Sequence, residues 1–572
     1  MSHLDRRTFL ALGKKTARPT QTITDQTLVP IPAALEAKMA ARAASPPTSG
    51  LAPYSGPWTK AEVLHLLRRT LFGPVKADVD YFLGKTMEAA VDEILNTPYV
   101  APPEPVNDYN NPNYTDPTVP FGQSFLNAPY EPGGEFYRLE SVRAWWIRQM
   151  LNSGRSIREK MTLFWYNHIP VQFTEAPFGS MLYRYNKLYR EQALGNFKTM
   201  MRAITLDPAM LIYLNGYLNA ASAPDENYAR EIQELFVIGK DLPDHFTEDD
   251  VKAAARLLTG WRTDGFTTYF FATEHDIGDK QFSAFYGNRL IKGPGQIDPN
   301  AGAAELDEFL DMLFDHPEAA RYVCRKLYRF FVYHEIDAQT EQNVIEPLAQ
   351  IFRNNNYDIL PVLDVLFKSE HFFDVLNRGA VIKSPVDMVV GLFKLFGVTL
   401  PGNADLLDNF AISLQMGVRM ADMLQQPGDP PNVAGWQAYY QKPFLDKLWI
   451  NTATLPERGR FTDTMVFAGI FGFNNRAVID PLAWASTLSD PADLNTLIDE
   501  SLDLLFGLPV SQTVKNSFKP ILLSGLPNDS YWTIAWELWE ANPGDQMLAG
   551  AVRTRLQAYL YRVLQIEETH LI

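Results

Sequence analysis

Apolar residues recur at three- and four-residue spacing along most of this chain of 572 residues. That spacing places them on one face of an α-helix, and it constrains the fold more than any other feature of the sequence. In "TKAEVLHLLRRTLFG", Thr59 with Glu62 three residues later predicts a capping box, and Gly73 is suited to close the helix. Helices are predicted over residues 59–73, 76–98, 136–152, 155–168, 180–201, 226–238, 247–260, 303–314, 317–334, 340–355, 360–368, 383–396, 403–425, 481–488, 491–505, 510–521 and 530–565.

Strand signals are scarce in comparison. The best is "GFTTYFFAT" at residues 265–273, which could pair with its polar continuation as a short hairpin. No internal repeat of about 20–50 residues emerges, so a regular solenoid is not supported. The sequence therefore predicts an all-α protein, a large orthogonal multi-helix array with a small β-hairpin element and long ordered loops.

Composition along the chain suggests three parts. Residues 1–57 form an Ala/Pro-rich arm, residues 58–460 a main helical domain, and residues 461–572 a C-terminal helical extension packed on it. Within the main domain, residues 98–135 are rich in Pro, Asn and Tyr and lack periodicity. Long loops of this kind inside a compact chain usually serve a function or lie over a groove. This insert could act as a pocket lid in an enzyme or as a docking surface in a scaffold.

Charge and cysteine content exclude several classes of function. The net charge of −16, without a large Lys/Arg stripe, opposes binding to nucleic acid or to anionic membranes. The longest apolar run, residues 465–473, is too short to span a bilayer, so no transmembrane segment is expected. The single cysteine, Cys324, excludes an intramolecular disulfide and a thiolate metal cluster, and it is expected to be a packed, inert thiol.

The N-terminus carries a motif that bears on localisation. Arg6 and Arg7 precede "TFLALG" in a pattern similar to the twin-arginine export consensus. An export signal needs an apolar segment of about 7–15 residues, and here Lys14 and Lys15 interrupt it early. Three interpretations stay open: a degenerate signal, export together with a partner, or a cytoplasmic N-terminus that matches by chance.

Several segments between residues 60 and 458 occur in an order that identifies a family. They are "AEVLHLLRRTLFGP", "WWIRQMLNSGRSIREKMTLFWYNHI", "DENYAREIQELFVIG", "FTEDDVKAAARLLTGW", "EHDIGDKQF", "HPEAARYVCRKLYRFFV", "IKSPVDMVVGLFKLFG" and "PPNVAGWQAYYQKPFLDKLWINTATLPER". They resemble a large bacterial family catalogued as domain of unknown function 1800 (DUF1800). The resemblance implies a mainly helical bacterial protein, often with an export signal, and therefore a periplasmic or envelope location. Such proteins are often encoded beside a second family, domain of unknown function 1501, which looks like the sulfatase and alkaline-phosphatase superfamily.

The densest group of polar residues lies in "APDENYAREIQELFVIG". Asn227, Glu231 and Glu234 fall on one helical face, and Arg230 lies four residues from Glu234. One interpretation is an Arg230–Glu234 ion pair with carboxylates that face solvent, and another is a buried network that joins this helix to its neighbours. The functional interpretation is that Asn227 and Glu231 face a cavity and present oxygens to a ligand or a hard cation.

Asn167 and His168 end the helix in "FWYNHIPVQF". A histidine at a helix C-terminus gains stability as a cation from the helix dipole, which is the structural interpretation. Alternatively, His168 is a ligand or a proton carrier that Asn167 orients.

Two loops supply further candidates. In "TEHDIGDKQF", His275, Asp276 and Lys280 could act as a base, its partner and an anion-holding charge, or could simply shape the loop. In "PPNVAGW", Asn432 and Trp436 follow a double proline and could close over a ligand, with Trp436 as a stacking wall; the ring could equally serve core packing.

The chain lacks HExxH, GxSxG, GxxxxGK[ST] and a post-strand GxGxxG motif. His, carboxylate and amide groups remain, which are compatible with metal-assisted hydrolysis, carboxylate-based sugar chemistry or plain ligand binding, with a divalent metal ion as a cofactor that the sequence leaves open. The leading hypothesis is one polar pocket in an envelope- or export-linked protein that binds or processes a carbohydrate- or peptide-like ligand. If the protein is an enzyme such as a hydrolase, Glu231 is the candidate general acid/base, with His168, or His275 beside Asp276, as second proton carrier. The alternative hypothesis is a non-catalytic scaffold that escorts the sulfatase-like neighbour.

Overall fold

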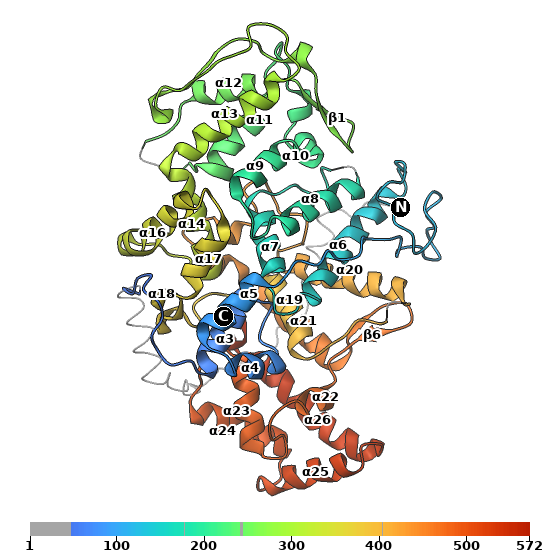
Figure 1. Ribbon diagram of the computed structural model, residues 1–572. Helices are drawn as coiled ribbons and strands as arrows, with labels where there is room; N and C mark the ends of the chain where they lie inside the picture. Colours follow the sequence, from blue (N-terminus) through green and yellow to red (C-terminus); the bar gives the residue numbers. More distant parts are fainter. Residues whose placement is uncertain (1–46, 177, 241–243, 403) are drawn as a thin grey trace, which may run out of the picture. The chain divides into compact units, whose positions relative to one another are not determined.

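The computed structural model describes residues 47–176, 178–240, 244–402 and 404–572. Contacts divide the chain into two units, Met1–Ser45 and Pro46–Ile572, and the described residues all belong to the second. The twin-arginine motif at Arg6 and Arg7 lies outside the described residues. Helices make up most of the second unit, and the strands are short, so the all-α prediction is confirmed (Figure 1).

In the first half of the chain, α6, α7 and α8 pack on one another, and Figure 1 shows them between α9–α13 above and α3–α5 below. Their bounds are α3 Lys60–Thr70, α4 Lys76–Leu83, α5 Met87–Asn96, α6 Glu135–Leu151, α7 Arg158–His168, α8 Gly179–Glu191, α9 Phe197–Thr205, α10 Pro208–Tyr213, α11 Asn227–Glu231, α12 Glu248–Leu257 and α13 Ala301–Asp315.

The second half continues with helices of similar length. They are α14 Pro317–Phe331, α15 Ala338–Thr340, α16 Glu346–Asn354, α17 Ile359–Phe367, α18 Glu370–Phe373, α19 Pro385–Leu395, α20 Leu406–Asp422, α21 Thr454–Phe467, α22 Pro481–Ala485, α23 Leu494–Leu505, α24 Gln512–Leu523, α25 Ser530–Ala541 and α26 Gln546–Val563. Two π-helical turns, Ile232–Val237 and Glu341–Ile345, continue α11 and precede α16.

The apolar faces of these helices merge into one continuous core. Helix α7 is buried from Glu159 to His168, because α8 packs along it and α14 and α6 also contact it. Helix α6 packs against α8 and α20. A helix that is buried all round positions its side chains rigidly, so the C-terminal end of α7 is a fixed support for whatever lies above it.

Local signals at helix ends act as the sequence predicts. The side chain of Thr59 and that of Glu62 form the capping box at the start of α3. Cys324 is buried in α14, and burial raises the pKa of its thiol. The helix predicted over 530–565 is in fact two, α25 and α26, because Pro543 and Gly544 interrupt it.

Three antiparallel pairs of strands are present in the described part of the chain: β1 Trp261–Thr263 with β2 Thr268–Phe270, β3 Lys280–Gln281 with β4 Leu290–Ile291, and β5 Ile470–Phe471 with β6 Arg476–Ala477. Within the predicted strand at 265–273, Thr268–Phe270 forms a strand, but its partner is the preceding segment and not the polar continuation. Gly265, at φ +91°, permits the tight reversal between β1 and β2, so the nearer segment pairs first.

The insert at residues 98–135 is ordered by a buried salt bridge. Arg138 on α6 donates from Nε to Asp116 Oδ2 at 3.1 Å and also contacts Glu135. Asp116 in turn accepts hydrogen bonds from the N–H groups of Thr118 and Val119. The insert is thereby fixed against α6, as a long ordered loop.

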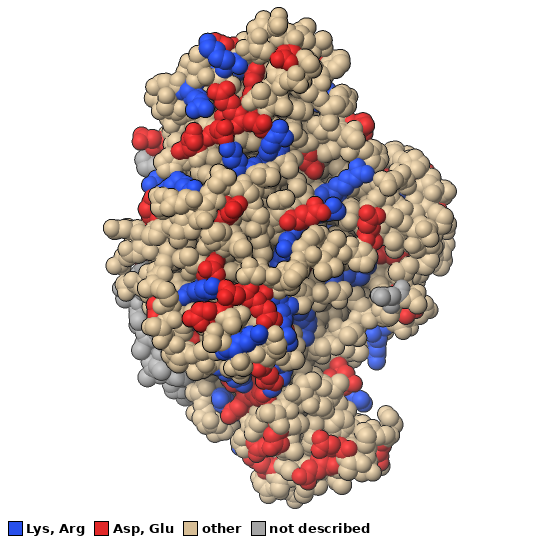
Figure 2. Space-filling model, viewed as in Figure 1, with Lys and Arg blue, Asp and Glu red and all other residues tan. Residues whose placement is uncertain are grey.

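Lys and Arg side chains lie beside Asp and Glu over much of the face shown in Figure 2, and carboxylates gather over the C-terminal helices. Within the described ranges, no helix is both long enough and apolar enough to cross a membrane. The predicted division of the chain at residues 57 and 460 stays a prediction.

Candidate functional site

The end of α7 holds the loop that contains "PPNVAGW". Asn167 Oδ1 accepts a hydrogen bond from the backbone N–H of Trp436 at 2.9 Å. Gly435 has φ +91°, and a Cβ added there would lie 2.2 Å from the carbonyl oxygen of Asn167. Only glycine permits this close approach. Trp436 is buried, so its ring packs in the core and does not form an open stacking wall.

His168 lies next to Asn167 in a cage of rings. Its ring centroid is 5.8–6.2 Å from those of Phe164, Trp165, Phe197 and Tyr322. Its Nε2 is 2.9 Å from the carbonyl oxygen of Phe236, while Nδ1 is buried without a partner among the described residues. Burial, together with repulsion from Lys326, lowers the pKa of His168 to about 3. The imidazole is therefore neutral near pH 7 and donates its Nε2 proton to the π-helical turn.

That turn, Ile232–Val237, follows α11 directly. A π-helical turn contains one residue more than an α-helical turn, and such turns occur often at functional sites. Side chains stabilise it from outside: Tyr322 Oη donates to the carbonyl oxygen of Leu235 at 3.0 Å, and Tyr286 Oη donates to Gln233 Oε1 at 2.9 Å. Gly239, two residues after the turn, has φ +94°, and a Cβ added there would lie 2.7 Å from the ring of Tyr322.

A cavity of about 430 Å³ lies between this turn, α14 and the loop after Trp436. We call it the α14 cavity. The described residues that line it are Glu234, Leu235, Ile238, Gly239, Lys240, Glu318, Tyr322, Arg325, Lys326, Arg329, Ile336, Glu341, Ala434, Tyr440 and Lys442. Its volume falls within the usual range for small-molecule sites, about 300–1,000 Å³.

The α14 cavity combines both signs of charge with two tyrosines. Five of the described lining residues are basic and three are acidic, an excess of positive charge in a chain of net charge −16. Arg325 contacts Glu341 at 2.6 Å and Glu318, so its guanidinium is held in place. The ammonium of Lys326 lies 5.1 Å from the centre of the Tyr322 ring. These contacts hold Arg325 against two glutamates and place the ammonium of Lys326 beside a tyrosine ring at the cavity wall.

Glu231 lies at the junction of α11 and the π-helical turn. Its Oε2 is buried and has no hydrogen-bond partner in the described part of the chain. Burial raises the pKa of the Glu231 carboxyl, and the neighbouring carboxylate of Glu234 raises it further, while Lys240 opposes both. A half-buried carboxyl with an unsatisfied oxygen has the properties expected of a proton carrier, although Glu231 does not itself line the α14 cavity.

The other residues of this helix have simpler surroundings. Arg230 pairs with Glu226 and Glu248 and lies 3.7 Å from Glu234, as the ion-pair interpretation predicts. Asn227 is exposed, and its backbone N–H donates to Asp225. Of the four candidate residues predicted in this segment, Asn227, Arg230, Glu231 and Glu234, Glu234 is therefore the one that lines the α14 cavity.

His275, Asp276 and Lys280 form a separate network. His275 Nε2 lies 3.1 Å from Glu305 Oε1, and Lys280 Nζ lies 2.6 Å from Glu305 Oε2. Asp276 binds Arg256 in a bidentate pair. Burial alone would raise the pKa of the Asp276 carboxyl, but the contacts with Arg256 and with the N–H of Gly278 outweigh it, and the pKa is lowered. The single pocket expected from the sequence is thus divided, because the loop packs on α12 and α13 and not on α7.

Asn432 shapes the loop above the cavity. Its Oδ1 accepts from the N–H of Ala434, and its Nδ2 donates to the hydroxyl of Tyr440, both at 2.9 Å. Asn432 therefore places two residues that line the α14 cavity, Ala434 and Tyr440, without lining the cavity itself.

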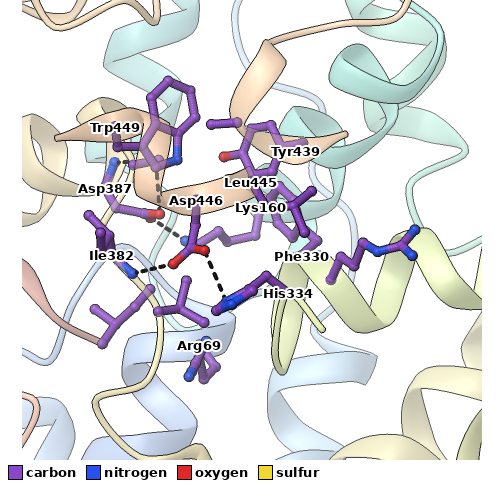
Figure 3. Close-up of a pocket in the computed structure, with 15 residues that line it drawn as sticks. Arg69, Lys160, Phe330, His334, Ile382, Asp387, Tyr439, Leu445, Asp446 and Trp449 are labelled. Carbon is purple, nitrogen blue, oxygen red and sulfur yellow. Dashed lines mark hydrogen bonds and ion pairs between the residues drawn. The ribbon is translucent and has the colours of Figure 1, made fainter. Parts of the chain in front are cut away.

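A smaller cavity of about 30 Å³ lies behind the same loop (Figure 3). Lys160 pairs there with Asp387, and His334 Nδ1 lies 3.0 Å from Asp446 Oδ1. Asp446 also accepts from the N–H of Ile382. The volume is that of about one water molecule, so this cavity serves packing of the ion pairs and holds no larger ligand. Arg329 lines both cavities.

No group of three or more His, Cys, Asp or Glu side chains in the described ranges is arranged to hold a metal ion. The α14 residues were not among those that the sequence singled out. Their signal is present in "ARYVCRKLYRFF", where Tyr322, Arg325, Lys326 and Arg329 share the face turned away from Cys324.

Comparison with known proteins gives one match. A family described as "Protein of unknown function (DUF1800)" matches residues 65–537. That range includes α14, the π-helical turn at Ile232–Val237 and the His275 network. No curated protein and no solved structure matches the chain.

Proposed function

This chain belongs to the DUF1800 family, and we propose that it binds an anionic, peptide- or carbohydrate-like ligand in the α14 cavity. The observation that supports this proposal is the surplus of basic side chains around a cavity of about 430 Å³ in an acidic chain. A carboxylate on the ligand would meet the ammonium of Lys326, which lies 5.1 Å from the centre of the Tyr322 ring at the cavity wall.

Acidic peptides and uronic-acid oligosaccharides both carry the carboxylate that this cavity would recognise. The tyrosines Tyr322 and Tyr440 supply apolar ring area next to polar groups, which suits either source. The experiment therefore includes both, as a pentaglutamate peptide and as trigalacturonic acid.

Binding is measured by isothermal titration of the full-length protein at low and moderate salt. We expect one of the two probes to bind, with an affinity that falls as salt rises, because charge pairing dominates. Lys326→Gln is expected to weaken binding about tenfold, which corresponds to about 1.4 kcal/mol.

The matched control is Lys252→Gln on α12, which removes the same charge from an exposed side chain outside the cavity. Its affinity should equal that of the wild-type protein. Equal affinities for both variants, or no binding of either probe, would refute the α14 cavity as the site.

If the protein is also an enzyme, Glu231 is the general acid/base of the proposal, because its buried oxygen lacks a partner among the described residues and its pKa is raised. Since Glu231 does not line the α14 cavity, this role requires a ligand that extends from the cavity to the Glu231 carboxyl. His168 then supports the π-helical turn as a neutral donor and does not carry the proton, since its pKa is about 3. His275 and Asp276 belong to the separate network and would hold the α12–α13 side in place. Glu231→Gln should retain ligand binding and lose turnover.

An envelope- or export-linked location belongs to this proposal through the motif at Arg6 and Arg7. Residues 1–57 fused to a reporter that requires twin-arginine export would test it. Export that depends on both arginines supports the location, whereas a reporter that stays in the cytoplasm contradicts it.

An escort role for a sulfatase-like partner is the second candidate. Three apolar side chains of α25, Tyr531, Ile534 and Leu538, are exposed at helical spacing on one face, which is the form of a protein-binding stripe. Co-purification of the tagged chain from its host decides this point. Recovery without the sulfatase-like protein, while that protein is expressed, would remove the second candidate.

A further inference from the structure

A second large cavity, of about 410 Å³, lies between α6, α20, the hairpin β5–β6 and the ordered insert. We call it the aromatic groove. The described residues that line it include Phe136, Tyr137, Glu140, Gln415, Phe471 and Phe473. None of its described lining residues belongs to the α14 cavity or to the candidate site residues named from the sequence, although two come from the insert at residues 98–135.

Three phenylalanine rings are unusually exposed around this groove. Phe136, Phe471 and Phe473 are 63%, 60% and 53% exposed. A single exposed apolar side chain needs no explanation, but three around one cavity form a patch that costs solubility without contributing to the core. Such a patch indicates a ligand that covers ring faces.

The rings stand on rigid supports. Asp408 on α20 accepts hydrogen bonds from the backbone N–H groups of Phe473 and Asn474, and from the side chain of Asn475. A Cβ at Gly472 would lie 2.5 Å from Asp408 Oδ1, so glycine allows the hairpin to close on that carboxylate. A preformed site of this kind loses little conformational entropy when a ligand binds.

The second wall is equally fixed. Tyr137 on α6 stacks on Tyr114 of the insert, with ring centroids 4.1 Å apart and an angle of 10° between the planes. Phe136 meets Tyr137 edge to face at 5.5 Å. The long insert therefore forms one wall of this groove. Its sequence composition alone does not show which cavity the insert borders.

The polar groups that line the described part of the groove are neutral, with the exception of Glu140. Asn111 and Asn113 come from the insert and Gln415 comes from α20. Of the described lining residues, only Glu140 is charged, and Arg143 pairs with it. Side-chain amides both donate and accept hydrogen bonds, as sugar hydroxyls do.

We propose that the aromatic groove binds a neutral oligosaccharide. The C–H face of a sugar ring would cover the exposed rings of Phe471, Phe473 and Phe136, while its hydroxyl groups would reach the amides at the rim. Nucleic acid also stacks on aromatic side chains, but its phosphates need a basic lining that the described part of this groove lacks. The site is independent of the proposed anionic ligand and stands if the α14 cavity binds nothing.

Saturation-transfer NMR on the full-length protein tests this proposal, because it detects weak binding and reports which sugar protons contact the protein. The probes are hexasaccharides of β-1,4-glucose, α-1,4-glucose, β-1,4-N-acetylglucosamine and α-linked mannose, with a proline-rich decapeptide as a competitor class. We expect at least one hexasaccharide to bind, with transfer strongest at ring C–H protons and with little dependence on salt.

Phe471→Ala and Phe473→Ala are each expected to weaken that binding about tenfold or more. Both side chains are largely exposed, so the fold should tolerate the changes. Phe271→Ala, at a phenylalanine that is 48% exposed and outside the groove, is the matched control and should bind as the wild type does. Failure of all four hexasaccharides to bind, equal loss in the control, or binding of the decapeptide alone would each overturn the proposal.

Discussion

His168→Gln tests whether the imidazole at the end of α7 is a neutral support or a proton carrier. Glutamine can keep the hydrogen bond, because its Nε2 can take the place of the histidine Nε2 that lies 2.9 Å from the Phe236 carbonyl oxygen. It loses the packing of the ring against Phe164, Trp165, Phe197 and Tyr322. The change therefore separates the titration of His168 from its hydrogen bond.

The expected magnitude follows from the gap between the ordinary pKa of 6.5 and the buried pKa of about 3. Because the folded state has the lower pKa, the contribution of neutral His168 to stability is present above pH 6.5 and is lost as the pH falls toward 3. At about pH 4.5 only the unfolded imidazole binds a proton, which costs the wild-type protein about 2.7 kcal/mol. Glutamine carries no such cost.

The assay is urea unfolding followed by tryptophan fluorescence from about pH 4.5 to about pH 8. At pH 8 the variant should be less stable by about 1–2 kcal/mol, because ring packing is lost. Its free energy of unfolding relative to wild type should then rise by about 2.7 kcal/mol on going to pH 4.5. Taking the difference cancels the acid response of the other histidines.

His245→Gln is the control, because that side chain is exposed. It shows how replacing an exposed histidine changes the free energy of unfolding over the same pH range, and the His168→Gln difference is compared with it. A His168→Gln difference that does not change with pH would show that burial does not lower the pKa of this histidine. A difference of the opposite sign would show that the folded protein holds a charged imidazole at this position, and the proton-carrier role would return.

Three further predictions concern Asp207, Glu231 and Gly435. Burial raises the pKa of Asp207 to about 7, so the free energy of unfolding falls as the pH rises from 3.8 to 7. Asp207→Asn keeps the helix cap and removes this loss. In urea unfolding it should stabilise the protein by up to about 4 kcal/mol at pH 8 and have little effect near pH 4. Because the pKa of Glu231 is raised, Glu231→Gln should increase the melting temperature at pH 8 relative to wild type and not at pH 4; an equal effect at both would contradict the raised pKa. Gly435→Ala should cost about 3 kcal/mol or more, because the added Cβ meets Asn167, and hydrogen exchange should show the loop at 432–442 opening faster.

Helix positions could be predicted because they depend on local signals. The capping box at Thr59 and Glu62 and the burial of Cys324 follow from residues close in sequence. The π-helical turn could not, because it needs contacts from Tyr322 and Tyr286, which are distant in the chain. The wrong partner assigned to the strand at 265–273 has the same origin, since periodicity identifies a strand but not the segment that pairs with it.

The sequence indicates some of the segments that lie near the α14 cavity but not which of them come together, because that depends on packing. The segments with Asn167, His168 and Glu234 do meet near one cavity, since they pack on the same side of α14. His275 does not join them, because its hydrogen bonds go to Thr259 and Glu305. Spacing along the chain indicates which side chains share a face of one helix, but only packing decides which faces share a cavity.

The extra residue in the turn at Ile232–Val237 fixes the rotational phase of the chain after it. One residue corresponds to about 100° around a helix axis. Deleting a single position there would restore ordinary α-helical geometry and swing Gly239 and Lys240 about a quarter-turn or more, carrying the glycine off the tyrosine ring it now touches. Sequence variants that change length at this point would therefore alter the outline of the α14 cavity, to which the turn contributes Glu234 and Leu235.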